Sequence, residues 1–179
     1  MNLTLKLNAR FQPMHRFELE DALQEILEQK NLGEITGGGT MQNPDGEITY
    51  CDIEICLFGK DIKRLEWLTD VLNSIGIPKG SVLYNDNNQI EVGTLEGLAC
   101  YLNGTELPVE TYQTCDINYV IEQMNLAMDG IGRMYSYWES KTYTALYFYG
   151  TSFSAMKEKI KQFTEEYPLC QKCRIEQIA

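Results

Sequence analysis

Histidine is the residue this chain has least of, and several common functional signatures are missing with it. Among 179 residues there is one histidine, His15, and there is no GxSxG, HExxH or paired cysteine–histidine signature. No apolar run approaches the ~18 residues that span a bilayer, and the start MNLTLKLNARF holds no apolar signal segment. These absences argue against α/β-hydrolases, metalloproteases and membrane-spanning proteins. We expect a cytoplasmic protein that does not bind membranes, and we assign no catalytic residue.

Basic residues are also few. The chain has 15 lysines and arginines against 26 acidic residues, which gives a net charge of −11. The first 92 residues carry 15 acidic and 8 basic residues and the remainder carries 11 and 7, so neither part is basic. Proteins that hold a nucleic-acid backbone usually concentrate positive charge. The charge therefore predicts no nucleic acid as a partner and favours a basic protein partner.

Cysteines are present, but a metal-binding pattern is not. The six cysteines stand at positions 51, 56, 100, 115, 170 and 173. Cys170 and Cys173 form a single CxxC with no second pair and no histidine nearby, which falls short of the ligands of a structural zinc site. We expect six free thiols, no metal ion and no cofactor.

Strand and helix periodicities alternate along the first half of the chain. Residues 3–11 alternate between apolar and polar as a half-buried strand does, and residues 19–27 follow helical spacing. The segments 34–41 and 47–58 predict two strands on either side of a turn. A helix that opens at Asp61 and strands at 81–84 and 89–92 complete a βαββαβ order.

The second half repeats this order. After a strand-like segment at 95–102 comes a helix from Asp116, then strands at 132–138 and 143–149, a helix from Phe153 and a closing strand. A short helix between Thr94 and Gly104 remains the alternative for the first of these segments. We therefore predict an α+β fold, a tandem pseudo-repeat of two ferredoxin-like βαββαβ units with antiparallel sheets. The units span residues 1–92 and 93–179, and we expect them to pack as one compact body.

Three consecutive glycines, Gly37 to Gly39, suggest a phosphate-binding loop at first sight. Such a loop needs its glycines between a strand and the N-terminus of a helix, where backbone amides and the helix dipole meet the phosphate. Here a turn and another strand follow instead. We interpret the segment as a bulged strand that another part of the chain approaches closely. The cleared strand either packs inside the protein or leaves a groove for a partner.

Aromatic residues are concentrated in the second half. The alignment of ICLFGKD (55–61) with LYFYGTS (146–152) places several tyrosines on the face of the second sheet that points away from the helices. Such a face packs against the other unit, binds a protein partner or stacks bases, and the negative charge disfavours stacking of bases. Trp67, away from the centre of its helix stripe, is a further anchor. The predicted partner-binding residues are Tyr135, Tyr137, Tyr143, Tyr147, Tyr149 and Trp67.

The connection after the first strand carries the lone histidine. As a catalytic base His15 would need a nucleophile and an orienting carboxylate, which the sequence does not place, so we interpret it as a loop histidine that holds the turn. Basic side chains and the glycine-rich strand could still border a small cleft. The candidate cleft residues are Arg10, His15, Arg16, Gly37, Gly38 and Gly39.

Two stretches carry a family resemblance. FQPMHR (11–16) and GEITGGGT (33–40) leading to CDIEI (51–55) resemble small, acidic, standalone bacterial proteins, found as uncharacterised genes or as immunity partners of polymorphic toxins. Immunity proteins of this kind are acidic, compact and non-enzymatic, and they neutralise a basic toxin by covering it. The resemblance implies this mode of action and carries over no catalytic residue.

These observations predict a function by binding. The first hypothesis is a non-enzymatic protein-binding module, an immunity or inhibitor protein that neutralises a basic partner such as a toxin by surface complementarity. The alternatives are a small-ligand-binding or sensor protein that uses the cleft between the two units, and an enzyme without a recognisable motif. Both a monomer and a homodimer are compatible with the sequence.

Overall fold

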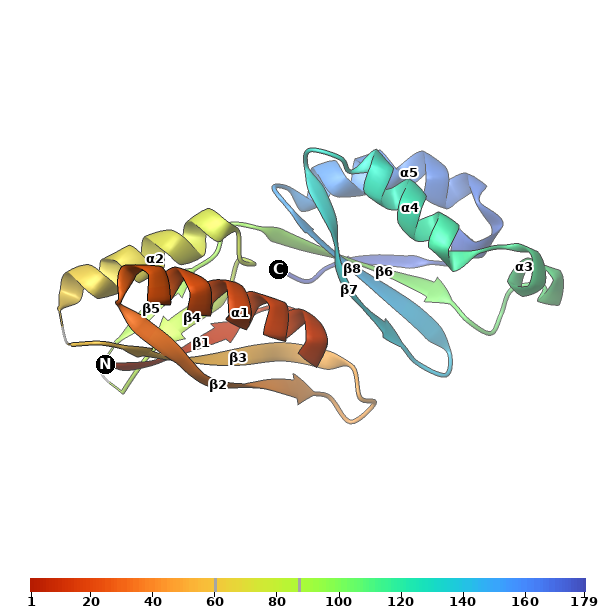
Figure 1. Ribbon diagram of the computed structural model, residues 1–179. Coiled ribbons are helices and arrows are strands. Elements are labelled where there is room, and N and C mark those ends of the chain that lie inside the picture. Colours follow the sequence, from red (N-terminus) through yellow and green to blue (C-terminus); the bar gives the residue numbers. More distant parts are fainter. Residues whose placement is uncertain (60, 87) are drawn as a thin grey trace. The chain divides into compact units, whose positions relative to one another are not determined.

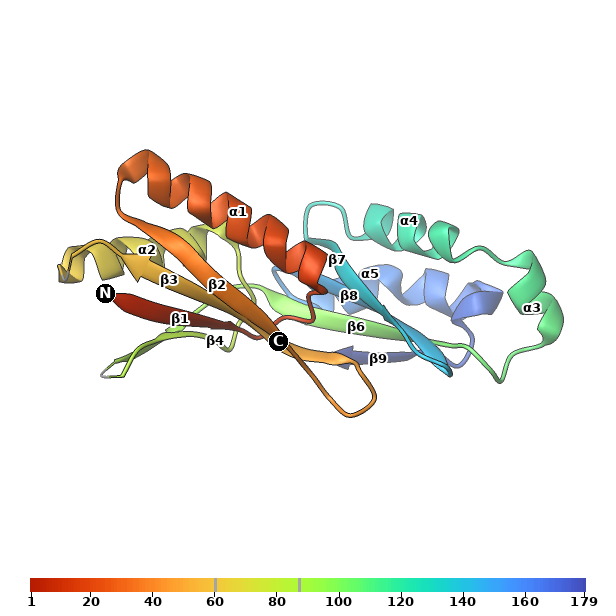
Figure 2. The same ribbon diagram turned by 60° about the horizontal axis from the view of Figure 1, so that its bottom comes forward.

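The computed structural model describes residues 1–59, 61–86 and 88–179. The chain divides into two units, Met1–Leu95 (unit 1) and Glu96–Ala179 (unit 2). The junction falls close to the boundary expected after residue 92. Each unit holds one antiparallel sheet with two long helices on one of its faces (Figures 1 and 2).

Unit 1 has five strands in the order β2-β3-β1-β4-β5. The two helices are α1 (Pro13–Lys30) and α2 (Ile62–Ile75). The side chain of Asp61 accepts a hydrogen bond from the amide of Lys63, and Gly76 ends α2 in the left-handed conformation at φ 77°. The strands are β1 (Asn2–Leu7), β2 (Gly33–Gln42), β3 (Ile48–Leu57), β4 (Ser81–Tyr84) and β5 (Gln89–Val92).

Unit 2 has four strands in the order β7-β8-β6-β9. They are β6 (Glu96–Asn103), β7 (Gly132–Glu139), β8 (Tyr143–Gly150) and β9 (Arg174–Gln177). The helices α4 (Ile117–Ala127) and α5 (Phe153–Glu166) cover one face. A short helix α3 (Val109–Thr114) and a 3₁₀ turn η1 (Pro168–Cys170) were not expected. The segment after Leu95 is a strand, which settles the alternative of a short helix.

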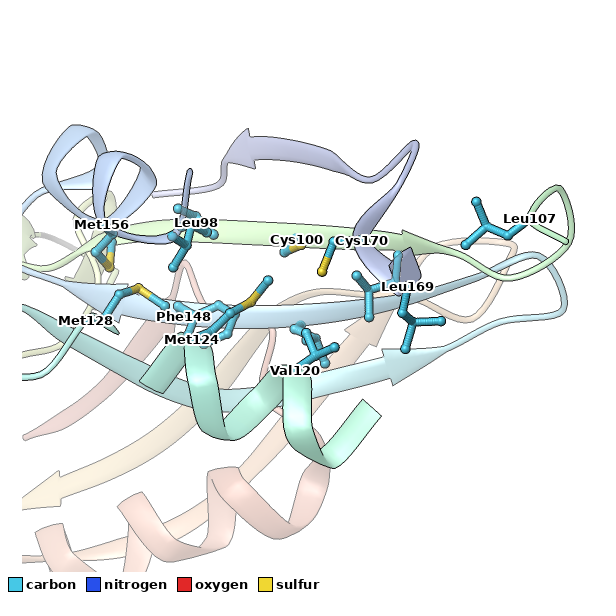
Figure 3. Packing of buried hydrophobic residues seen from close by; sticks show 13 residues of the cluster. Leu98, Cys100, Leu107, Val120, Met124, Met128, Phe148, Met156, Leu169 and Cys170 are labelled. Atoms are coloured by element: carbon cyan, nitrogen blue, oxygen red, sulfur yellow. The ribbon is translucent and has the colours of Figure 1, made fainter. Parts of the chain in front are cut away.

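The inward faces of both sheets form the cores. In unit 1, Leu5 pairs with Ile53 and Leu3 with Ile55 across β1 and β3, and all four side chains are buried. In unit 2, residues of β6 and β8 meet methionines and valine from α4 and α5 (Figure 3). The predicted α+β fold of two ferredoxin-like units with antiparallel sheets is thereby confirmed.

Two element ends differ from the expectation. The first strand ends at Leu7, because the amide of Asn8 donates to the hydroxyl of Ser81 at 3.0 Å and leaves the ladder with β3. Helix α1 begins at Pro13, where proline suits the first position because its missing amide proton is not needed there. Within the described residues no helix is long and apolar enough to cross a membrane.

The core assignment of β1 predicts a stability difference between neighbouring residues. Leu5→Ala should lower the free energy of unfolding by ~2–5 kcal/mol, because Leu5 is fully buried and its truncation leaves a cavity. Lys6→Ala, on the opposite, exposed face, should cost ~1 kcal/mol or less. Urea denaturation of both variants measures the difference. Equal costs would contradict the assignment of the two faces.

Candidate functional site

The glycine-rich strand β2 makes room for an ion pair of helix α1. Gly38 pairs with Ile53 and therefore faces the helix, where an added Cβ would overlap the guanidinium of Arg16 and lie 2.7 Å from the backbone oxygen of Asp52. Arg16 is only 6% exposed and donates a hydrogen bond to the carboxylate of Glu20 one turn further along α1. The strand is cleared for a neighbour inside the unit.

The predicted bulge is present in this strand. The pairing of β2 with β3 shifts between Ile35 and Gly37, and the amide of Ile35 is bound by the side-chain oxygen of Gln24 on α1 at 2.6 Å. Helix α1 thus satisfies the backbone where the ladder is interrupted. The sequence does not indicate that Gln24 binds the backbone of β2 or that Glu20 pairs with Arg16, because both occupy ordinary polar positions of a helix.

Burial governs the titration of this region. It raises the pKa of Glu20, against the opposing attraction of Arg16. It likewise raises the pKa of the Cys51 thiol, which donates to the backbone oxygen of Phe11 at 3.3 Å. The Nε of Arg16 is buried and has no hydrogen-bond partner among the described residues. The region is therefore a tightly packed structural contact between α1 and β2.

The other predicted cleft residues divide between structure and surface. His15 lies in the first turn of α1, not in a loop, and its amide donates to the backbone oxygen of Gln12. Arg10 donates to the backbone oxygen of Ile48 at 2.7 Å. The structure brings Arg16 and Gly38 together. Gly39 instead faces the other side of the sheet, opposite Asp52, where an added Cβ would meet no atom within 4 Å.

A second bulge changes the predicted tyrosine face of unit 2. The pairing of β7 with β8 shifts between Met134 and Ser136, so Ser136 lies opposite Tyr147 and Tyr137 lies opposite Leu146. Tyr137 is therefore on the same face of the sheet as core residue Leu146, and the prediction that it joins the open face is wrong. The extra residue in β7 inverts the alternation beyond it.

The expected exposure of the central tyrosines is also wrong. Tyr147 and Tyr149 are 0% and 1% exposed, although they point away from α4 and α5. The ring of Tyr135 meets that of Tyr149 edge to face at 5.6 Å between centroids. Tyr135, Tyr143 and Trp67 are half-buried, and Tyr137 is 42% exposed. Buried rings on an inner strand cannot serve as anchors for an incoming partner.

The structure does contain a groove that the sequence did not indicate. It lies in unit 2 between α5 and the segment from η1 to β9, and has a volume of about 720 Å³. Ligand pockets commonly measure ~300–1,000 Å³. Lys157 and Lys161, one helical turn apart, lie along one side of it. Lys172, in the turn before β9, also lines it, and we call this feature the lysine groove.

Polar and acidic side chains complete the lysine groove. Ser154, Thr164 and Gln171 line it, as do Glu158 and Glu165. The ammonium group of Lys172 lies 3.4 Å from a carboxylate oxygen of Glu106, and both side chains are well exposed. An exposed pair of this kind contributes only ~0.2–1 kcal/mol, so an anionic ligand can compete for Lys172. The spacing of Lys157 and Lys161 on one helix face was the signal that could have revealed the groove.

All six cysteines are free thiols, and two of them, Cys170 and Cys173, line the lysine groove. Cys51 and Cys56 point to opposite faces of β3. Among the residues that the structure describes, no group of three histidine, cysteine or acidic side chains is placed to hold a metal ion.

Comparison with known proteins gives little beyond the architecture. No family model matches the chain, and no curated protein matches it. One similar solved structure is that of the first two RRM domains of the yeast poly(U)-binding protein Pub1. That likeness covers 100% of this chain and 99% of the other, at 13% sequence identity and a TM-score of 0.27.

Two predictions are corrected at this point. The protein-binding, immunity-like function is not supported, because Tyr147 and Tyr149, the central rings expected to anchor the partner, are buried. The predicted partners, a basic toxin and no nucleic acid, are corrected with it. Negative net charge misled the second prediction, since a total over the chain conceals a local group of lysines.

The environment of Gly38 yields a paired prediction. Gly38→Ala should destabilise unit 1 by ~1–3 kcal/mol, because the new methyl group collides with Arg16 and with the backbone of β3. Gly39→Ala, which meets no atom, should be neutral or slightly stabilising. Chemical denaturation distinguishes the two. A harmless Gly38→Ala would show that the ion pair can leave its position without cost.

The burial of β8 yields a second paired prediction. Tyr147→Ala should lower the free energy of unfolding by ~3–5 kcal/mol, as expected for truncation of a fully buried aromatic side chain. Tyr137→Ala, at an exposed edge position, should cost much less. Thermal unfolding followed by circular dichroism provides the measurement. If both variants were equally stable, Tyr147 would have to be accessible after all.

Proposed function

We propose that this protein binds a phosphate-bearing ligand in the lysine groove of unit 2. The observation that carries the proposal is the convergence of Lys157, Lys161 and Lys172 on one concavity in an acidic chain. An ammonium group acts on phosphate as a compact point charge with three donors. The groove is a binding site without a chemical step, in keeping with the non-enzymatic prediction.

The sequence positions of the lysines explain why they meet. Lys157 and Lys161 are four residues apart on α5, so they project from the same helix face. Met156 and Ile160, each directly before one of these lysines in the sequence, are fully buried and fix the rotation of the helix. Lys172 has a left-handed backbone at φ 57°, in the turn that faces this side of α5. The three charges are therefore positioned by the fold of unit 2 alone.

Two glutamates limit what the groove accepts. Glu158 and Glu165 bring negative charge to the same concavity, which leaves a small positive excess. A ligand with a single carboxylate gains little from such a site, whereas a phosphate can contact more than one lysine and keep its other side away from the glutamates. Ser154 and Gln171 offer neutral hydrogen-bond donors beside the lysines.

The phosphate can come from two sources. One is a small phosphorylated molecule, and the other is the backbone of a single-stranded nucleic acid. Two probes separate them, adenosine triphosphate without metal and a single-stranded oligouridylate, each titrated by calorimetry. Binding of the oligonucleotide should weaken steeply with added salt because counterions are released from its backbone. Saturable binding of either probe supports the groove, and absence of binding by both overturns it.

Substitution of the groove lysines tests the location. Lys157→Gln and Lys161→Gln should each reduce affinity for the binding probe by ~10-fold, the value of a hydrogen bond to a charged group. Lys159→Gln removes the same charge from an exposed position of α5 outside the groove and should leave affinity nearly unchanged.

Removal of a groove carboxylate gives the opposite sign. Glu165→Gln should strengthen binding several-fold, because a like charge close to the phosphate is neutralised. If Lys159→Gln weakens binding as much as Lys161→Gln does, the ligand is responding to overall charge and the groove is not its site.

A further inference from the structure

Three cysteines of unit 2 lie in one cluster that the proposed function does not use. Cys100 is on β6, Cys170 ends η1, and Cys173 immediately precedes β9. Figure 3 shows Cys100 and Cys170 within the core of unit 2, between β6 and η1. Cys173 packs against the same cluster while remaining partly exposed.

The strand register explains the approach of Cys173 to Cys100. Cys100 lies opposite Ile175 and Tyr101 opposite Arg174 in the antiparallel pair of β6 and β9. Cys173, two residues before Ile175, therefore projects toward the same side of the sheet and forms a diagonal neighbour of Cys100. Diagonal neighbours across an antiparallel pair are ~7–8 Å apart, with their Cβ atoms somewhat closer, which is near the upper limit of separation for a disulfide.

A tight turn fixes Cys173 in this position. Gln171 has φ −60° and ψ 139°, Lys172 has φ 57°, and the amide of Cys173 donates to the backbone oxygen of Cys170 at 3.1 Å. These values describe a type II β-turn. The turn returns the chain to the edge of β6, and Cys173 both packs against the core and lines the lysine groove.

The thiols differ in their acidity. The thiol of Cys100 donates a hydrogen bond to Cys173, which lowers the pKa of Cys173 and, with burial, raises the pKa of Cys100 well above its ordinary value. Burial raises the pKa of Cys170 to about 12. Cys173 is thus both the most acidic and the most accessible thiol of the three. A thiolate is the nucleophile in thiol–disulfide exchange.

We propose that Cys173 and Cys100 form a reversible disulfide when the protein meets a low-molecular-weight disulfide such as oxidised glutathione. Cys173 loses its proton and attacks one sulfur of glutathione disulfide, whose S–S bond breaks and releases one glutathione thiolate. Cys100 then loses its proton and attacks the Cys173 sulfur of the mixed disulfide, and the second glutathione leaves as a thiolate. Two protein thiols are oxidised, the reagent is reduced to two thiols, and both leaving thiolates take up a proton.

This couple is independent of any phosphate ligand. It joins a central strand to the turn that carries Lys172, at the wall of the lysine groove. Oxidation therefore has a structural readout of its own, the covalent link between β6 and the segment before β9. Failure of ligand binding would not affect that readout.

Peptide mapping after oxidation tests the proposal. The full-length protein is incubated with oxidised glutathione, and the remaining thiols are alkylated. The chain is then cleaved with trypsin, which cuts after Lys172 and so separates Cys170 from Cys173, and with a protease that cuts after glutamate, so that Glu106 and Glu110 separate Cys100 from Cys115. We expect a linked pair of peptides that contains Cys100 and Cys173 and disappears on reduction. A Cys170–Cys173 link, or a Cys173 that retains glutathione in the unsubstituted protein, would overturn the assignment of Cys100 as partner.

Variants resolve the order of the two steps. Cys100→Ser should stop at the glutathione adduct on Cys173, Cys173→Ser should give neither adduct nor link, and Cys170→Ser should still form the link. Cys100→Ala serves as a second variant should serine destabilise the buried site. In Cys100→Ala the hydrogen bond that lowers the pKa of Cys173 is absent. The adduct should therefore form more slowly at a given pH, and the pH dependence of its rate should move to higher pH. Unchanged adduct formation on Cys173→Ser would show that another thiol reacts.

Discussion

Burial of the inward face of two central strand pairs is the constraint on which the rest of the structure depends. β1 with β3 in unit 1, and β6 with β8 in unit 2, carry fully buried apolar side chains toward the helices. Because side chains alternate along a strand, fixing one face fixes the other. The helices can then rotate only so that Leu23 and Leu27, or Met156 and Ile160, meet that face. The positions of the polar groups on these helices, Arg16 and Glu20 on α1 and Lys157 and Lys161 on α5, follow from these rotations.

The polar residues of the helices have different surroundings in the two units. In unit 1, α1 turns Arg16 and Glu20 toward β2, and the strand accommodates them by lacking a side chain at Gly38. In unit 2, α5 turns its lysines outward along the groove beside β9. The same βαββαβ arrangement therefore produces a closed ion pair in one unit and an open cationic groove in the other. The two features lie beside different edges of the repeated sheet, the ion pair of α1 beside β2 and the lysines of α5 beside β9.

Two strand bulges and one turn decide where several important side chains lie. The bulge in β2 recruits Gln24, and the bulge in β7 removes Tyr137 from the open face. The turn at Lys172 places a lysine and a cysteine at the edge of the sheet, in a conformation that glycine usually adopts. None of these features belongs to the repeating pattern, and each redirects a side chain that a regular strand would have sent elsewhere.

The sequence by itself determined the order of the elements, because alternation in residues such as Leu3, Leu5 and Leu7 and the capping aspartates Asp61 and Asp116 act locally. It also indicated the bulged glycine strand. Only the tertiary structure decided that Tyr147 is buried, that Glu20 pairs with Arg16 under Gly38, and that Lys172 joins Lys157 and Lys161. These outcomes depend on residues distant in the chain and on one-residue shifts of register. Periodicity within a single segment carries no information about either.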